Sequence, residues 1–231
     1  MSASGRPSIQ LPFSEKYSHA HAQAYFAKHR DGFMRRLSDW REQRIAGKAL
    51  RMAGDPGLVL DLPCGAGRFW PLLSRHPNRA IIAADNAAGM LEVACATQPA
   101  AIVSRVRTLQ TSAFDIALPD GAVDSIFCMR LLHHIGAPEH RHAMLREFHR
   151  VTRDSVIVSL WVDGNYMAWK RKRLEAKRAR RASGGYQNRF VLPAALVETE
   201  FREAGFNIGG HIDFLPRHSM WRIYVLRKDA A

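Results

Sequence analysis

The chain has 231 residues, of which 47% are hydrophobic and 24% are charged. This composition excludes a mostly disordered protein, and no apolar run approaches the roughly 18 residues that a membrane-spanning helix needs. The N-terminal residues lack the apolar core of a secretion signal, and the three cysteines fit no zinc module. We therefore expect a protein of the reducing cytoplasm.

The net charge of +13 is concentrated in two segments. Residues 1–54 carry a net charge of +6 and residues 165–181 carry +7, whereas residues 55–164 carry −1 and residues 182–231 carry +1. Charge that is confined in this way indicates an anionic partner rather than a requirement of the fold.

In chain order, the first predicted element is a helix over residues 17–53 that ends at the turn formed by residues 54–57. Its expected apolar face consists of Phe33, Leu37, Trp40, Ala49, Leu50 and Ala53. A regular alternation of strands and helices follows. Apolar segments predict strands over residues 58–62, 80–84, 102–109, 123–129 and 156–160. Helices are predicted over residues 67–75, 87–97 and 138–151.

After the fifth predicted strand the pattern changes. Residues 165–190 are very basic, residues 193–204 are predicted to be a helix that ends at Gly205, and residues 206–213 and 220–227 are predicted to pair as antiparallel strands.

Strands that are separated by helices predict right-handed βαβ units and a parallel sheet covered on both faces. We therefore predict an α/β fold with a Rossmann-like, doubly wound sheet of seven strands, mostly parallel. Residues 1–55 are expected to form an N-terminal helical cap. Residues 56–231 are expected to form the main domain, with residues 165–190 as a basic insert after strand five.

The most informative motif follows the first predicted strand. Asp61 precedes Gly65 by four residues, and Gly67 follows, in a strand–turn–helix order that lets a ligand approach backbone N–H groups. A dinucleotide-binding fingerprint would need a third glycine where Trp70 stands. A phosphate-binding loop would need Lys-Ser or Lys-Thr after Gly67, where residues 68–69 are Arg-Phe.

Two acidic residues indicate another ligand. Asp61 suits a ligand with an ammonium group, and Asp85, at the end of the second predicted strand, can accept hydrogen bonds from both ribose hydroxyls. A molecule with an amine at one end and a ribose near the other is S-adenosylmethionine. A glycine turn with two acids at strand ends also occurs in many other α/β folds, and this simpler interpretation stays open here.

The chain also resembles the class I S-adenosylmethionine-dependent methyltransferases, especially the type 11 group, over roughly residues 56–160. The similar segments are Leu60–Arg68, Ala84–Asn86 with Met90 and Leu91, Ser112–Asp115, Leu118–Gly121, Val123–Phe127, Leu132–Ile135 and Arg146–Val151, with weaker similarity at Phe201–Phe206. Together these segments are specific for the cofactor and not for the substrate.

The resemblance implies that the main domain binds S-adenosylmethionine and releases S-adenosylhomocysteine. Asp61, Gly65 and Gly67 would hold the methionine end, and Asp85 would hold the ribose, with Asn86 beside the adenine. The full set of cofactor-binding residues that the resemblance implies is Asp61, Pro63, Cys64, Gly65, Gly67, Asp85, Asn86, Met90, Ser112, Ala113, Phe114 and Met129.

Two positions depart from the family's pattern. Ala84 stands where the family usually has glycine, and Ser112 stands where it often has an acid. A serine hydroxyl can still accept a hydrogen bond from the adenine amino group, although a neutral partner contributes less. Asp115 is close enough in sequence to substitute for that acid.

Methyl transfer from a sulfonium mainly requires that the nucleophile be held in line, so a general base is needed only where a proton must leave. The candidates for catalysis are His133, His134 and Arg130. In the alternative interpretation, the histidines form a structural corner of the fold and Arg130 pairs with a carboxylate. Cys64 and Cys128 are expected to be small buried packing residues.

No metal site is expected. The pairs His19–His21 and His140–His142 have a spacing that suits metal binding, but no acid or cysteine completes either set.

The basic segment over residues 169–181 has three interpretations. It is a solvated helix, it binds an anionic lipid or glycolipid surface, or it binds nucleic-acid phosphates. Tyr166, Met167 and Trp169 precede the charges and favour the lipid interface. No RNA-binding motif is present, and an anionic nucleotide acting as a regulator is a further, weaker candidate.

We therefore expect a cytoplasmic methyltransferase, peripheral at the inner face of the membrane. Its acceptor would be an oxygen or nitrogen of a small, lipid-linked or glycan-linked molecule near an anionic surface. An RNA or tRNA methyltransferase that uses both basic segments is the second hypothesis. A sensor that binds a nucleotide without catalysis is the third.

Overall fold

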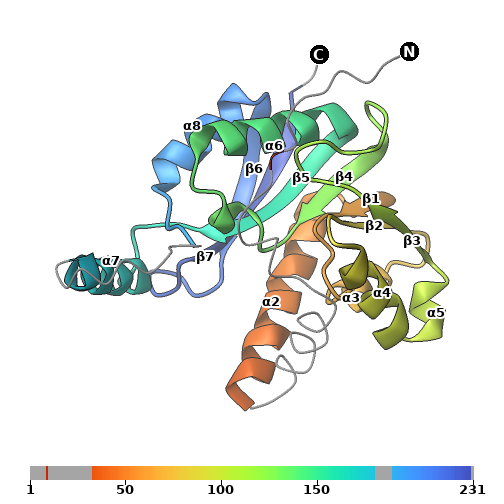
Figure 1. Cartoon of the computed structure of the whole chain (residues 1–231), viewed down its shortest axis with the longest axis horizontal. Coiled ribbons are helices and arrows are strands. Elements are labelled where there is room, and N and C mark those ends of the chain that lie inside the picture. Colours follow the sequence, from red (N-terminus) through yellow and green to blue (C-terminus); the bar gives the residue numbers. More distant parts are fainter. Residues whose placement is uncertain (1–8, 10–32, 180–188, 230–231) are drawn as a thin grey trace.

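The computed structural model describes residue 9 and residues 33–179 and 189–229. A seven-stranded sheet in the order β3-β2-β1-β4-β5-β7-β6 forms its centre (Figure 1). The strands are β1 (Leu58–Asp61), β2 (Ala80–Asp85), β3 (Val106–Gln110), β4 (Val123–Cys128), β5 (Thr152–Trp161), β6 (Phe206–Asp213) and β7 (Trp221–Lys228). The first five strands are parallel, and β7 runs antiparallel to both β5 and β6. The predicted fold class is therefore confirmed.

Helices cover both faces of the sheet. They are α2 (Phe33–Met52), α3 (Trp70–Leu73), α4 (Ala88–Thr97), α5 (Ala100–Val103), α6 (Pro138–Val151), α7 (Tyr166–Ala179) and α8 (Ala194–Glu203), with a 3₁₀ turn η2 (Leu132–His134). Side chains of α6 and α8 pack on one face, and those of α2, α3 and α4 pack on the other. Among the described residues, no helix is both long and apolar enough to cross a bilayer.

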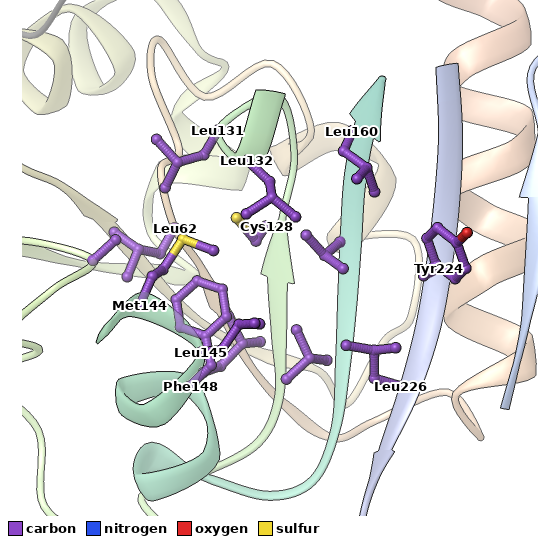
Figure 2. Close-up of a cluster of buried hydrophobic side chains, with 14 of the residues drawn as sticks. Leu62, Cys128, Leu131, Leu132, Met144, Leu145, Phe148, Leu160, Tyr224 and Leu226 are labelled. Atoms are coloured by element: carbon purple, nitrogen blue, oxygen red, sulfur yellow. The ribbon is translucent and has the colours of Figure 1, made fainter. Parts of the chain in front are cut away.

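The larger core lies under α6. Met144, Leu145, Phe148 and Val151 are spaced along one side of this helix and are fully buried, because three- and four-residue steps align side chains on a single face. Figure 2 shows Met144, Leu145 and Phe148 directed toward the strands that carry Cys128 and Leu160. Each large apolar side chain buried in this way stabilises the fold by roughly 1.5–3 kcal/mol. Burial of Cys128 confirms its predicted packing role.

The second half of α2 packs on the opposite face of the sheet. Ala49, Leu50 and Ala53 are buried there, as predicted. The predicted apolar face is wrong for the first half, since Leu37 is 47% exposed and Trp40 is 55% exposed. The reason is visible in Figure 1, where this half of α2 projects beyond the sheet and has no strand to cover. Residues 17–32 of the predicted helix lie outside the described residues.

Two other predicted boundaries were wrong, for local reasons. The helix predicted over residues 67–75 is confined to α3, because Gly65 and Gly67 have φ values of 53° and 70°, which a right-handed helix excludes. The strand predicted from residue 102 begins only at Val106. The carbonyl oxygen of Pro99 accepts the backbone N–H of Ile102 and starts the short helix α5 instead.

The C-terminal elements follow the prediction. Gly205, with a φ of 83°, ends α8, and the chain then enters the antiparallel pair β6 and β7. The basic residues after β5 begin in α7, at one end of the molecule's longest axis (Figure 1). The division into an N-terminal cap, a main domain and a basic insert stays a prediction.

Candidate functional site

A cavity of about 550 Å³ opens at the carboxyl end of the parallel strands. It is lined by the segments that follow β1, β2, β3 and β4 and by part of α2. Parallel α/β sheets bind ligands at this edge, because successive connections leave a crevice between them. The predicted cofactor-binding residues that line it are Pro63, Cys64, Gly65, Asp85, Asn86, Met90, Ser112, Ala113, Phe114 and Met129. Asp61 and Gly67 are not among the lining residues.

Asp85 joins two loops of the cavity wall. One of its carboxylate oxygens accepts the backbone N–H of Gly65 at 3.0 Å, and the other accepts the backbone N–H of Ala87 at 3.0 Å. Burial raises the pKa of Asp85, and these N–H donors oppose the shift. Each carboxylate oxygen has more than one acceptor site, so capacity remains for hydroxyl groups of a ligand.

Asp61 is a buried carboxylate with no cationic partner among the described residues. It is 1% exposed, and neither of its carboxylate oxygens accepts a hydrogen bond. Burial, and then the charge of Asp85, raise the pKa of Asp61 well above its ordinary value, and the nearby indole N–H of Trp70, which lies outside hydrogen-bond geometry, opposes that shift. Unsatisfied buried carboxylates are rare in native proteins, because each costs about 1–3 kcal/mol or more. A cationic group beside Asp61 would remove this cost.

This arrangement makes a prediction for the ligand-free protein. Asp61→Asn is expected to raise the free energy of unfolding at pH 7 by at least about 1 kcal/mol, because it removes a buried carboxyl whose ordinary charged form is disfavoured by folding. Folding raises the pKa of Asp61. Its contribution to stability is therefore complete below its ordinary pKa of about 4, and it is lost as the pH rises through the pKa of the folded state. The variant should lack this dependence in urea denaturation between pH 4 and pH 8.

Asp115→Asn is the matched control, since Asp115 is exposed and does not line the cavity. This change should leave stability within about 0.5 kcal/mol of wild type. Equal stability of wild type and Asp61→Asn at every pH would show that the Asp61 carboxyl is already satisfied.

The two glycines of the motif have different roles. Gly65 presents its backbone to the cavity, and a Cβ placed there would meet no atom within 4 Å. Gly67 shapes the turn instead, because a Cβ there would lie 2.8 Å from the Trp70 side chain. Only glycine therefore fits position 67, although it does not line the cavity.

The loop after β3 forms another wall. The hydroxyl of Ser112 accepts the backbone N–H of Phe114 at 3.2 Å, and the hydroxyl of Thr111 accepts the backbone N–H of Ala117 at 2.9 Å. Asp115 is exposed and does not line the cavity, so the structure gives no support to its replacing Ser112.

An ion-pair cluster closes the side of the cavity that faces α2. Glu42, which is 5% exposed, accepts hydrogen bonds from Arg130 at 2.5 and 2.9 Å and from Arg68 at 2.7 Å. Arg68 also donates to Asp39 at 2.6 Å. Burial alone would raise the pKa of Glu42, but the two guanidinium groups outweigh it and lower that pKa. Arg130 therefore pairs with a carboxylate, as one of the two alternatives expected, and it also lines the cavity, while its role in catalysis stays a prediction.

The backbone of Arg130 is unusual. Its φ of 65° is in the left-handed region, which disfavours residues other than glycine. The hydroxyl of Ser159 accepts its N–H at 2.8 Å, and its guanidinium lies 5.1 Å from the ring centroid of Trp221. Strained backbone of this kind occurs where surrounding contacts hold a side chain in a functional position.

The two histidines separate in the structure. His134 lines the cavity, whereas His133 is 3% exposed and does not. The His133 ring stacks on Trp161 at 4.9 Å and contacts Trp221 at 4.8 Å, and burial lowers its pKa to about 2. A histidine with this pKa is a poor general base at neutral pH. The structure thus favours the alternative in which His133 packs at a corner of the fold.

Sequence reasoning missed part of the cavity wall. The missed lining residues include Asp39, Arg68, Phe69, Pro71, Thr97, Gln98, Pro99, Thr111 and Leu131. Arg68 and Phe69 stand within or beside the glycine motif, so their position was a usable signal. The remainder come from segments with no motif of their own. Gln98, for example, donates from its side chain to the carbonyl of Ala66 at 3.3 Å.

Among the residues that the structure describes, no group of three side chains is arranged to hold a metal ion. His19 and His21 lie outside the described part of the chain.

Comparison with known proteins finds similarity in the middle of the chain. Residues 59–155 match the family model described as a methyltransferase domain. This segment is therefore similar to a methyltransferase domain. A curated, uncharacterized protein of Synechococcus sp. is 35% identical over 91 residues, which are 38% of this chain and 21% of that protein. The methyltransferase domain thus matches about a fifth of that relative's length.

Solved structures share the fold at low sequence identity. Magnesium protoporphyrin IX methyltransferase of Synechocystis PCC 6803, crystallised with S-adenosylhomocysteine, has a TM-score of 0.71 and 14% identity over 93% of this chain and 97% of that chain. The [4+2]-cyclase SpnF has a TM-score of 0.63 and 17% identity over 82% of this chain and 81% of that chain. Because a cyclase shares this fold, the reaction of this protein has to be argued from its site.

Proposed function

We propose that this protein transfers the methyl group of S-adenosylmethionine to an oxygen or nitrogen of a small, lipid-linked or glycan-linked acceptor. The observation that carries the proposal is the buried, unpartnered carboxylate of Asp61 beside a cavity that Asp85 and Gly65 line. These two carboxylates are acceptors that suit a ligand with a cationic amine and a vicinal diol, which are the groups that the cofactor carries.

The chemistry of the described residues supports this choice of cofactor. Asp61 would pair with the amine, Asp85 would accept from the ribose hydroxyls, and the loop with Ser112 and Phe114 would contact the adenine. Gly65 leaves its backbone open toward the cavity, where any side chain would take up space. When bound, S-adenosylmethionine supplies a methyl group that its sulfonium sulfur already activates.

The chain's own contribution to the reaction is position and charge. Holding two reactants in line supplies on the order of 7–11 kcal/mol of the barrier reduction. Arg130 and His134 follow β4 and line the cavity, and they are the candidates to orient the acceptor. The Arg130 guanidinium is fixed by Glu42 and Trp221, so it presents a rigid cationic group to the cavity.

The test is incubation of the purified protein with methyl-tritiated S-adenosylmethionine and a fractionated cell extract. We expect label in small organic or lipid fractions. Label confined to RNA would support the RNA methyltransferase instead. Binding of the cofactor without label in any fraction would support a nucleotide-binding sensor and contradict the proposed reaction.

A further inference from the structure

Helix α7 presents a strongly basic outer surface. It begins directly after the loop that follows β5 and contains Lys170, Arg171, Lys172, Arg173 and Lys177 among its described side chains, with Glu175 as their acidic neighbour. Arg171 pairs with Glu175 at 2.8 Å, whereas the three lysines are exposed. In Figure 1, α7 lies at the far end of the molecule from β3 and α5.

Exposed aromatic and apolar groups accompany these charges. Tyr166 is 49% exposed, Trp169 is 53% exposed and Leu174 is 48% exposed. The Tyr166 and Trp169 rings contact at 5.9 Å, and the Arg173 guanidinium lies 4.8 Å from the Trp169 ring centroid. A helix that mixes lysines with an aromatic pair and a leucine suits the boundary between lipid headgroups and acyl chains.

A chain of side-chain contacts leads from the other side of α7 to the cavity wall. The Arg171 guanidinium lies 4.9 Å from the Trp161 ring, which stacks on His133 at 4.9 Å. The His133 ring in turn lies 4.1 Å from His134, which lines the cavity. Because β5 is parallel to β4 and β1, its end at Trp161 lies at the same edge of the sheet as the cavity. A surface bound by α7 would therefore adjoin the side on which the cavity opens.

We propose that the outer surface of α7 binds anionic lipid headgroups and brings the cavity to an acceptor held in or at that lipid surface. The second part rests on the proposed methyl transfer, whereas the binding itself does not. A lipid surface is favoured over nucleic acid because the Trp169 ring is already in contact with both Tyr166 and Arg173. A platform for stacking bases instead spaces its aromatic rings along the strand.

The test is sedimentation of the full chain with vesicles of phosphatidylcholine alone and of phosphatidylcholine mixed with phosphatidylserine. We expect partitioning to the mixed vesicles only. The triple variant Lys170→Gln, Lys172→Gln, Lys177→Gln should lose on the order of 100-fold in partitioning, since each basic residue near an anionic leaflet contributes roughly fivefold. Trp169→Ala should lose roughly tenfold through its smaller apolar contact.

The matched control removes three exposed charges elsewhere, by Arg75→Gln, Arg107→Gln and Arg146→Gln. It should retain vesicle binding within a few-fold. Equal recovery of wild type with both vesicle types, or equal losses in the two triple variants, would overturn the proposal. So would tRNA binding that the lysine variant abolishes while vesicle binding stays.

Calorimetry with S-adenosylmethionine separates this proposal from the proposed function. Both triple variants should bind the cofactor as wild type does, because none of the six residues lines the cavity. Vesicle binding without cofactor binding would contradict only the methyl-transfer proposal, and the reverse result would contradict only the lipid proposal.

Discussion

Asp85→Ala is expected to weaken binding of S-adenosylmethionine by on the order of 100-fold, which corresponds to about 2.7 kcal/mol. The variant would lose charge-assisted hydrogen bonds to the ribose, each worth about 1.5–3 kcal/mol. It would also release the backbone N–H groups of Gly65 and Ala87, which Asp85 now holds at 3.0 Å. Titration calorimetry of the purified variant against wild type measures the change directly.

Asp115→Ala is the control for this experiment. It also removes a carboxylate from the loop after β3, but Asp115 is exposed and does not line the cavity. Its affinity for the cofactor should stay within about twofold of wild type. Undiminished binding by Asp85→Ala would contradict the assignment of the ribose to this carboxylate. A loss of affinity in Asp115→Ala as large as that in Asp85→Ala would show that cofactor binding by the loop after β3 depends on an acid after all.

Glu42→Gln is expected to lower the free energy of unfolding by about 2–3 kcal/mol. Breaking a fully buried ion pair costs about 3–5 kcal/mol, and the partial exposure of Arg68 (19%) and Arg130 (30%) reduces that figure through solvent screening. Denaturant titration at neutral pH gives the change. Because Glu42 also fixes Arg130 at the cavity wall, the variant should lose methyl-transfer rate in addition to stability.

The pH dependence of this contribution has a defined sign. The folded protein lowers the pKa of Glu42, so its contribution is complete above the ordinary value of about 4.3 and is lost as the pH falls through the folded-state pKa. Asp61 changes stability in the opposite direction, since folding raises its pKa. Glu203→Gln, an exposed glutamate on α8, should change stability by no more than about 0.5 kcal/mol. An equal effect of the two substitutions would contradict the role given to Glu42.

The alternation of buried strands and helices was predictable from the sequence because burial on both faces leaves continuous apolar runs, as at Val59 and Leu60. Local sequence was a poorer guide where long-range packing decides the outcome. Leu37 and Trp40 have helical spacing, yet they are exposed because α2 extends past the sheet. The late start of β3 reflects a proline-initiated turn that competes with an alternating apolar pattern.

The residues of the candidate site also fall into a group that the sequence could predict and a group that it could not. Residues at strand ends, such as Asp85 and Gly65, could be predicted because parallel strands deliver their carboxyl ends to one edge. The cluster of Glu42 with Arg68 and Arg130 could not, since it joins segments 26 and 88 positions apart without a shared motif. The packing of His133 between tryptophans was also hidden, because Trp161 and Trp221 come from strands late in the chain.

The most direct test of the central claim is a crystal structure of the protein with S-adenosylhomocysteine, supported by its measured affinity. We expect the product's amine near the Asp61 carboxylate and its ribose hydroxyls on Asp85, with the adenine beside Phe114. Micromolar binding with this placement would establish the cavity as the cofactor site. An absence of measurable binding, or a product molecule held elsewhere with Asp61 still unpartnered, would contradict the account.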